Sequence, residues 1–250
     1  MIVSEKRRVL KLFVSIVTTK NILDVIEETL TARGKKLTVA CANAYYVIET
    51  YNNEELASIL NSIDILHADG AGVRWALRFL YAEQLSNERI TGTDLYYKIL
   101  ELANANSWKL FLFGDSQNVI STAITKINNQ YPRIQVVGSY RGYVDIDNPE
   151  PRMLIKQSKP DILFLGLGMP RQEYWLKKYY TEIQVPVCVV VGGGIAFVSG
   201  LRKRAPQSMR SMGLEWFFRL FQSPKIVWRR YLLGIPKFMF YIFLQKVRQK

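Results

Sequence analysis

Asp69 is the carboxylate in this 250-residue sequence whose surroundings best suit chemistry. It follows an apolar run, Ile63 to His67, and lies between two small residues, Ala68 and Gly70, that leave its side chain open to a ligand. A carboxylate in such a loop can reach a substrate hydroxyl and take its proton as a general base. Asp is also a favoured N-cap, and a helix is expected from Ala71. The sequence leaves both roles open.

Three glycine-containing turns follow other apolar runs, at Gly114-Asp115-Ser116, Gly166-Leu167-Gly168 and Gly192-Gly193-Gly194. Glycine lets backbone amides approach a diphosphate closely, although tight turns between strands and helices use glycine in any case. None of the turns is a P-loop, because no Gly-Lys-Ser/Thr occurs, and none completes G-x-G-x-x-G with a following acid. A nucleotide-binding oxidoreductase is therefore a poorly supported alternative.

Asp145 and Asp147 have the D-x-D spacing with which many sugar-nucleotide enzymes hold a divalent cation. Asn148 and Pro149 follow directly and favour a polar turn, so we interpret the pair as a solvated turn. The only histidine, His67, excludes a multi-histidine zinc site. We predict no metal and no cofactor.

Short β-branched runs alternate with longer helical patterns up to about residue 200. This alternation predicts an α/β protein with a mostly parallel, Rossmann-like sheet flanked by helices. The expected strands are Leu12–Val17, Leu37–Ala42, Ile63–His67, Leu110–Phe113, Ile134–Gly138, Ile162–Leu167 and Val187–Val191. Helices are expected at Gln117–Gln130 and Arg171–Ile183. Ligands bind beyond the carboxyl ends of such strands, where Asp69 and the glycine turns lie.

The segment Leu201–Lys250 contains 12 Lys and Arg, one acid and 10 of the 31 aromatic residues. We therefore divide the chain into a catalytic body, residues 1–200, and a basic, aromatic-rich helical appendage, residues 201–250, called the tail below. Such a composition favours an anionic membrane surface. Tyr231–Leu244, its longest apolar stretch, is too short to cross a bilayer of about 30 Å. The alternative, a non-enzymatic nucleic-acid binder, leaves the motifs of the body unexplained, and we expect no nucleic-acid partner.

Cys41 and Cys188 lie inside apolar runs, so we expect reduced core thiols and a cytoplasmic protein. The sequence leaves open whether the protein forms a homo-oligomer.

Several short motifs occur in a specific order along the chain. They are Asn43 of a Thr-x-Asn element, Ala68-Asp69-Gly70, the residues from Glu88 to Asp94, Tyr131-Pro132, Gly142-Tyr143, the residues from Gly166 to Glu173, Arg204-Ala205-Pro206, and Gly213-Leu214-Glu215-Trp216 with Arg219. In these motifs the chain resembles the WecG/TagA/CpsF family of bacterial glycosyltransferases, from about Val9 to about Arg230.

This resemblance implies an inverting transfer of N-acetylmannosamine or a related hexose from a UDP-sugar. The acceptor is GlcNAc on undecaprenyl diphosphate, in cell-envelope or capsule polysaccharide synthesis, and the enzyme is peripheral on the inner face of the membrane. Asp69 is then the general base, and Arg204, Arg219 and Arg230 neutralise a diphosphate. The implied substrate-binding residues are Asn43, Arg89, Thr93, Asp94, Gly166, Gly168, Gln172 and Glu173.

The chain departs from the family pattern at two places. Cys41 stands where the Thr-x-Asn element begins, and Ile195-Ala196 replaces the usual Phe-Asp after the last glycine turn. These departures remove a hydroxyl and a carboxylate, so they affect the choice of donor sugar. For that reason, a glucosyl donor is kept as an alternative to N-acetylmannosamine.

Overall fold

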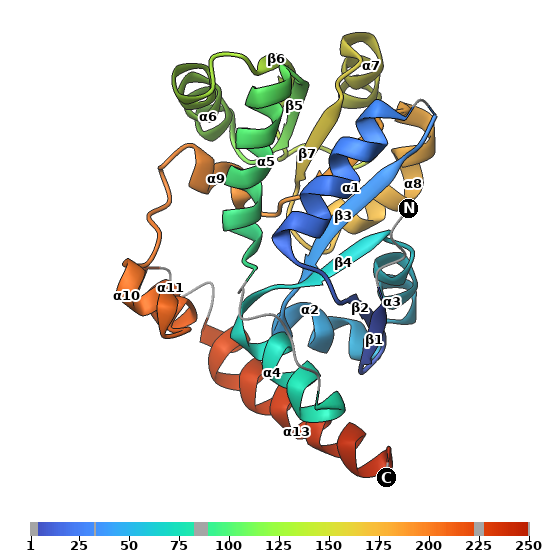
Figure 1. Cartoon of the computed structure of the whole chain (residues 1–250), viewed down its shortest axis with the longest axis vertical. Coiled ribbons are helices and arrows are strands. Elements are labelled where there is room, and N and C mark those ends of the chain that lie inside the picture. The colour runs from blue at the N-terminus through green and yellow to red at the C-terminus, as the bar shows by residue number, and fades with distance from the viewer. Residues whose placement is uncertain (1–4, 33, 83–89, 223–227, 250) are drawn as a thin grey trace.

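The computed structural model describes residues 5–32, 34–82, 90–222 and 228–249. Within those residues it contains an eight-stranded sheet of order β1-β2-β4-β3-β8-β7-β5-β6 (Figure 1). Only the β1–β2 pair of this sheet is antiparallel. The strands are β1 (Lys6–Val9), β2 (Leu12–Ser15), β3 (Leu37–Ala42), β4 (Ile65–Ala68), β5 (Lys109–Gly114), β6 (Gln135–Tyr140), β7 (Ile162–Gly166) and β8 (Val187–Val190). The predicted α/β fold with a mostly parallel sheet is confirmed.

The helices of the described residues fall into those of the body and those of the tail. In the body they are α1 (Thr19–Thr31), α2 (Ala44–Glu49), η1 (Thr50–Asn52), α3 (Glu54–Asn61), α4 (Gly70–Tyr81), α5 (Gly92–Asn106), α6 (Gln117–Gln130), α7 (Pro149–Ser158), α8 (Arg171–Ile183) and α9 (Gly194–Val198). In the tail they are α10 (Gln207–Ser211), α11 (Glu215–Gln222), η2 (Arg229–Leu233) and α13 (Gly234–Arg248).

The side chains of the central strands alternate between two helical layers. On β5, Phe111 and Phe113 face the layer of α2, α3, α4, α7, α8 and α13, whereas Leu110 and Leu112 face α1, α5, α6 and α9. All four side chains are buried. Because both faces of the sheet are covered, its strands read in the sequence as continuous apolar runs.

The helices predicted at Gln117–Gln130 and Arg171–Ile183 have the observed bounds of α6 and α8. Each of the seven predicted strands is present, and no predicted end differs from the observed one by more than two residues. The prediction missed β1, Lys6–Val9, because three of its four residues are charged. This strand pairs with β2 across a tight turn at Leu10, which has φ of 54°.

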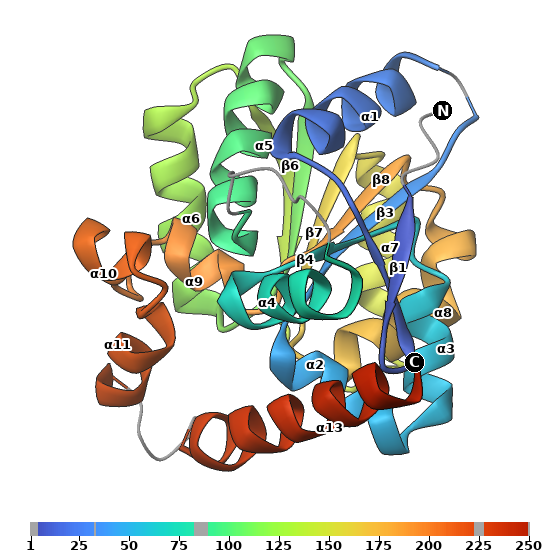
Figure 2. The same cartoon turned by 60° about the horizontal axis from the view of Figure 1, so that its bottom comes forward.

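The tail ends in α13, which lies against α2 and α4 of the body (Figure 2). Phe238 and Ile242 of α13 are almost fully buried, and Tyr241 stacks on Tyr51 with ring centroids 4.2 Å apart. Gln245 bonds the backbone of the β1–β2 turn. Of the helices in the described ranges, none combines the length and apolar character needed to cross a membrane. The division at residue 200 stays a prediction.

Candidate active site

Asp69 follows β4 at the carboxyl edge of the sheet, and its backbone N–H donates to the carbonyl of Ala42 at the end of β3 (2.8 Å). It is the N-cap residue of α4, yet its side chain makes no capping bond to that helix. Its Oδ1 instead accepts a 3.1 Å hydrogen bond from the backbone N–H of Gly92. The carboxylate therefore lies at the N-terminus of α5, where the helix dipole favours negative charge.

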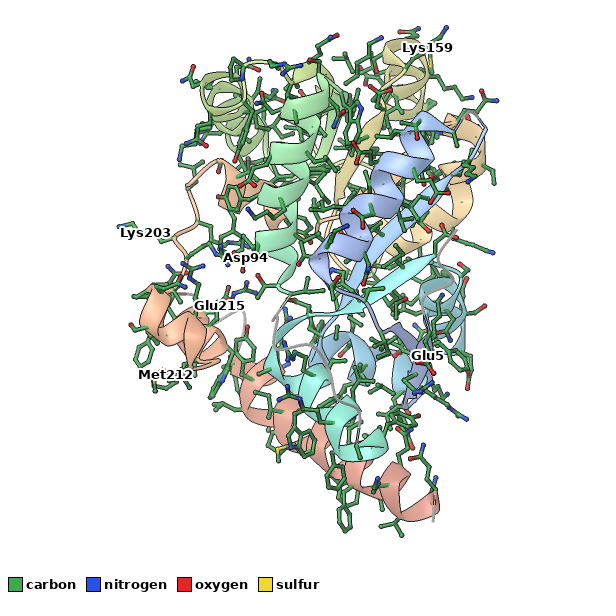
Figure 3. The ribbon with its side chains drawn as sticks, in the orientation of Figure 1. Glu5, Asp94, Lys159, Lys203, Met212 and Glu215 are labelled. Carbon is green, nitrogen blue, oxygen red and sulfur yellow. The ribbon has the colours of Figure 1, made fainter. Side chains whose placement is uncertain are left out.

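The first turn of α5 carries a second carboxylate, Asp94. Its Oδ2 accepts from the hydroxyl of Thr91 (2.6 Å), and Thr91 caps the helix by accepting from the Asp94 N–H. Its Oδ1 accepts from Nη1 of Arg204, also at 2.6 Å, and Arg210 lies 3.7 Å away. Figure 3 shows Asp94 on α5 facing the tail segment that carries Glu215. Residues more than a hundred positions apart thus meet beside Asp69.

Burial opposes ionisation of Asp94, but the hydrogen bonds from Arg204 and Thr91 outweigh it and lower the pKa of the carboxyl. The pair is therefore charged on both sides at neutral pH. Arg204 has 18% of its side-chain surface exposed and Asp94 has 47%, so the contact is only partly screened by water.

Arg219 of α11 lies in the same region. Its Nη2 donates to Oε1 of Glu215 at 3.0 Å, and its guanidinium carbon is 5.3 Å from the ring centre of Phe197. Burial works against the charge of Arg219, but the carboxylates of Glu215 and Asp69 keep its pKa above the ordinary value. The charge of the predicted base, Asp69, therefore reaches a cation of the tail.

Arg230 of η2 stands over the ring of Tyr45, with its guanidinium carbon 4.8 Å from the ring centre. Its positive charge also acts on the thiol of Cys41. Burial, followed by the charge of Asp69, raises the pKa of that thiol, which keeps it protonated. The three predicted tail arginines, Arg204 included, are thus placed around the loops that follow β3 and β4.

Asn43 comes directly after β3 and caps α2. Its Oδ1 accepts from the backbone N–H groups of Tyr45 and Tyr46, at 3.0 and 3.2 Å. This oxygen fixes where α2 begins, which is an ordinary use of Asn at an N-cap. Asn43 therefore shapes the loop beside Asp69, and its contact with substrate stays a prediction.

The glycine turns bring backbone groups into close contact at the same edge. A Cβ on Gly114 would lie 2.2 Å from the carbonyl oxygen of Gly166, and one on Gly166 would lie 2.7 Å from that of Gly192. Gly168 differs, because its φ is +77° and a Cβ there would meet nothing within 4 Å. Gly168 thus supplies a left-handed turn with open space beside it, where a ligand can approach the backbone.

Gln172 and Glu173 are fully buried on the first turns of α8. Nε2 of Gln172 donates to the Tyr46 hydroxyl at 2.8 Å and to Oε1 of Glu173 at 2.9 Å. Among the described residues, Oε1 of Gln172 and Oε2 of Glu173 have no hydrogen-bond partner. Burial raises the pKa of Glu173 and that of the Tyr46 hydroxyl. These groups join α8 to α2 beneath the site, and substrate contact by Gln172 and Glu173 stays a prediction.

Two further predictions concern the edges of this region. Thr93 is buried on the first turn of α5, and Arg89 lies outside the described residues. Asp147 donates its N–H to Oδ1 of Asp145, and its own Oδ1 pairs with Lys178 at 2.7 Å. The D-x-D pair is thus the predicted polar turn. Within the described ranges, no group of three or more His, Cys, Asp or Glu is arranged to hold a metal ion.

Two buried tyrosines of this region, Tyr46 and Tyr96, were not among the predicted site residues. The Tyr96 hydroxyl donates to the carbonyl of Val190 at 3.3 Å. A Cβ on Gly92 would lie 2.9 Å from the oxygen of the same hydroxyl. Both tyrosines read in the sequence as ordinary core aromatics. Their hydroxyl partners come from other elements, so no local pattern identifies them.

The model of the "Glycosyl transferase WecG/TagA/CpsF family" matches residues 7–250. A Bacillus spizizenii N-acetylglucosaminyldiphosphoundecaprenol N-acetyl-beta-D-mannosaminyltransferase is 33% identical over 214 residues, 86% of this chain and 81% of that protein. A protein of the same description from Staphylococcus aureus strain MW2 is 32% identical over 206 residues, 82% of this chain and 79% of that protein.

The family match covers nearly the whole chain, and it includes the loop of Asp69, the first turn of α5 and the arginines of the tail. These are the parts that the structure brings together at the carboxyl edge of the sheet. On this evidence, the chain belongs to the WecG/TagA/CpsF family of glycosyltransferases.

Proposed function

We propose that this protein transfers N-acetylmannosamine or a related hexose from a UDP-sugar to GlcNAc carried on undecaprenyl diphosphate. The names of the two relatives above state the sugar and the lipid-linked acceptor for those proteins. The product would belong to cell-envelope or capsule polysaccharide synthesis. We further propose that the enzyme works peripherally, on the cytoplasmic face of the membrane that holds the acceptor lipid.

The observation that carries the proposal is the position of the Asp69 carboxylate. It does not cap its own helix, and it is held by the N–H of Gly92 at the start of α5. A general base needs such a fixed orientation at a strand end, within reach of a bound hydroxyl. Asp69 would remove the proton of an acceptor hydroxyl as that oxygen attacks the anomeric carbon.

The arginines of the tail supply the complementary charge. As the bond between the anomeric carbon and the phosphate oxygen breaks, UDP leaves with the electron pair and gains negative charge. Guanidinium groups stabilise such a charge through paired N–H donors. Three observations support this role: Asp94 accepts from Arg204, Arg230 stands over the ring of Tyr45, and the charge of Asp69 reaches Arg219. The single displacement needs no covalent intermediate and inverts the anomeric centre.

The thiol of Cys41 bears on which sugar is used. A Cβ on Gly92, whose N–H is bonded to Asp69, would lie 3.4 Å from Sγ of Cys41, so the thiol lies near the predicted base. A thiol is a weaker hydrogen-bond donor than the hydroxyl of threonine. We propose that this position influences the choice between N-acetylmannosamine and a sugar such as glucose.

An assay with defined donors and acceptors tests the proposed function. The protein is incubated with UDP-N-acetylmannosamine, UDP-glucose and UDP-GlcNAc, each with a GlcNAc-diphosphate-lipid acceptor. Released UDP and the extended lipid are measured by mass. We expect turnover with one donor and a product longer by one residue of that donor's sugar. No product with any donor, from protein shown to be folded, would overturn the proposal.

A further inference from the structure

Large apolar side chains lie exposed on α4 of the body as well as on α13 of the tail. We call these residues together the α4–α13 face. It consists of Trp75, Phe79, Met239, Phe240, Phe243 and Val247, which are 36% to 58% exposed. On α4, positions 71, 75 and 79 are exposed and recur every fourth residue, so they form one side of the helix, and Arg78 is exposed beside them. The rings of Trp75 and Phe79 stack on each other, with centroids 5.2 Å apart.

The helices α4 and α13 run side by side in the same direction (Figures 1 and 2). At one end, a Cβ on Gly72 would lie 3.8 Å from the ring of Phe238. At the other end, Nζ of Lys246 donates to the carbonyl of Leu80 at 2.6 Å. Each helix advances eight residues between these contacts, which is about 12 Å. Their exposed sides therefore form one continuous surface.

The apolar stripe of α13 borders the aromatic pair of α4. Phe243 precedes Lys246 by three residues and Met239 precedes it by seven, so all three lie on one side of α13. Nζ of Lys246 is 5.9 Å from the ring centre of Phe79. The stripe thus reaches the rings of α4, and the two helices share the surface that they expose.

The charge of this surface indicates what covers it. Neither α4 nor α13 contains an acidic residue. Arg78, Lys237, Lys246 and Arg248 lie on these helices. Aromatic and aliphatic side chains bordered by cations match the headgroup region of an anionic bilayer, on which an amphipathic helix lies in the plane of the surface.

We propose that Trp75 and Phe79 enter the interface of an anionic lipid bilayer together with the exposed stripe of α13. The body then contacts the membrane directly, and the contact is not confined to the tail. This inference rests on the proposed function, because an enzyme with a lipid-linked acceptor must reach the bilayer that holds the acceptor. It also joins the membrane contact to the active site, since Asp69 is the N-cap of α4.

Flotation with vesicles tests the inference. The full chain is mixed with vesicles of phosphatidylglycerol and phosphatidylcholine, and in parallel with vesicles of phosphatidylcholine alone. The double variant W75S/F79S is compared with M153S, which changes an exposed side chain on α7 at the far end of the molecule (Figure 1). We expect W75S/F79S to lower the partition onto anionic vesicles about tenfold and M153S to leave it within about twofold. Unchanged partition of a folded W75S/F79S protein would overturn the inference.

A second measurement reports on Trp75 itself. The variant W75F keeps an aromatic ring, so binding should stay within about twofold of the original, but the indole is lost. With brominated lipids, we expect less quenching of tryptophan fluorescence in W75F than in the unchanged protein. Equal quenching would place Trp75 outside the bilayer.

A measurement of activity distinguishes failure of this inference from failure of the proposed function. With a water-soluble GlcNAc-diphosphate acceptor, W75S/F79S should keep the turnover of the unchanged protein. If no variant and no donor gives product, the proposed function fails while the vesicle result still stands. If turnover is present and W75S/F79S binds vesicles normally, the membrane inference alone fails.

Discussion

Nη1 of Arg204 lies 2.6 Å from Oδ1 of Asp94, which joins the tail to the first turn of α5. The same turn donates the Gly92 N–H to Asp69. One turn of helix therefore holds both the predicted base and an arginine of the tail. This connection joins the tail to the loop of Asp69, whatever the role of the tail at the membrane.

The Asp94–Arg204 pair should be coupled in stability and in activity. We expect Asp94→Asn to lower the free energy of unfolding by about 1 kcal/mol and to lower kcat/KM, because Arg204 loses its anchor. A double-mutant cycle with Arg204→Gln, followed by urea unfolding, measures the coupling. The matched control is Asp24→Asn, which breaks the exposed Lys20–Asp24 pair and should cost at most about 0.5 kcal/mol. Strictly additive effects of the two substitutions at the site would contradict the prediction.

Asp69→Asn should remove the base without removing the fold. The amide can still accept the N–H of Gly92, so we expect the melting temperature to change little. We expect kcat to fall by about 10²- to 10⁴-fold while donor binding is kept. Asp145→Asn, the same change in an exposed turn, is the control and should leave kcat unaltered. A normal rate for Asp69→Asn would remove this residue from the chemistry.

Burial of Glu173 predicts a specific dependence of stability on pH. Its pKa is raised in the folded protein, so the folded state holds the proton more tightly than the unfolded state. The stabilising contribution is complete below the unfolded pKa of about 4.3 and is lost as pH rises through the folded pKa. We expect Glu173→Gln to remove this loss. Urea unfolding at pH 4.5 and at pH 7.5 measures it, and parallel pH profiles of the two proteins would contradict it.

The buried side of α13 should contribute strongly to the stability of the whole chain. Phe238 is 1% exposed against α2 and α4, so Phe238→Ala should lower the free energy of unfolding by about 3–5 kcal/mol. Phe240 lies on the exposed side of the same helix, and Phe240→Ala should change it by less than about 0.5 kcal/mol. Thermal unfolding of the two variants makes the comparison. Equal, small effects would show that α13 folds independently of the body.

Much of the fold could be predicted because its signals are local. Strands such as Leu37–Ala42 are continuous apolar runs, and α6 shows its buried face at Ile120, Ala123 and Ile127. The strand Lys6–Val9 was missed because a charged edge strand is neither a continuous apolar run nor a segment with a periodic buried face. It forms by pairing with β2, and pairing depends on the turn between them.

The loops that form the candidate site could be predicted from the sequence. The contacts between residues of different loops could not. Asp69 was singled out by its neighbours in sequence, but its bond to Gly92 depends on how α5 is placed. Asp94 and Arg204 are 110 positions apart, so no spacing in the sequence pairs them. The burial of Glu173 likewise depends on the approach of α2, which brings Tyr46 over it.

The helix that Asp69 precedes as N-cap, α4, also carries Trp75 and Phe79, and it is 12 residues long. A helix of that length is a rod of about 18 Å. With its aromatic side in the lipid headgroups, the helix would lie flat on the bilayer and hold the carboxylate at its N-terminus at one height, close to the headgroups. A sugar attached directly to a lipid diphosphate lies at one fixed height, whereas the end of a longer glycan does not. The position of α4 on the bilayer would then favour acceptors that carry a single sugar on the lipid diphosphate.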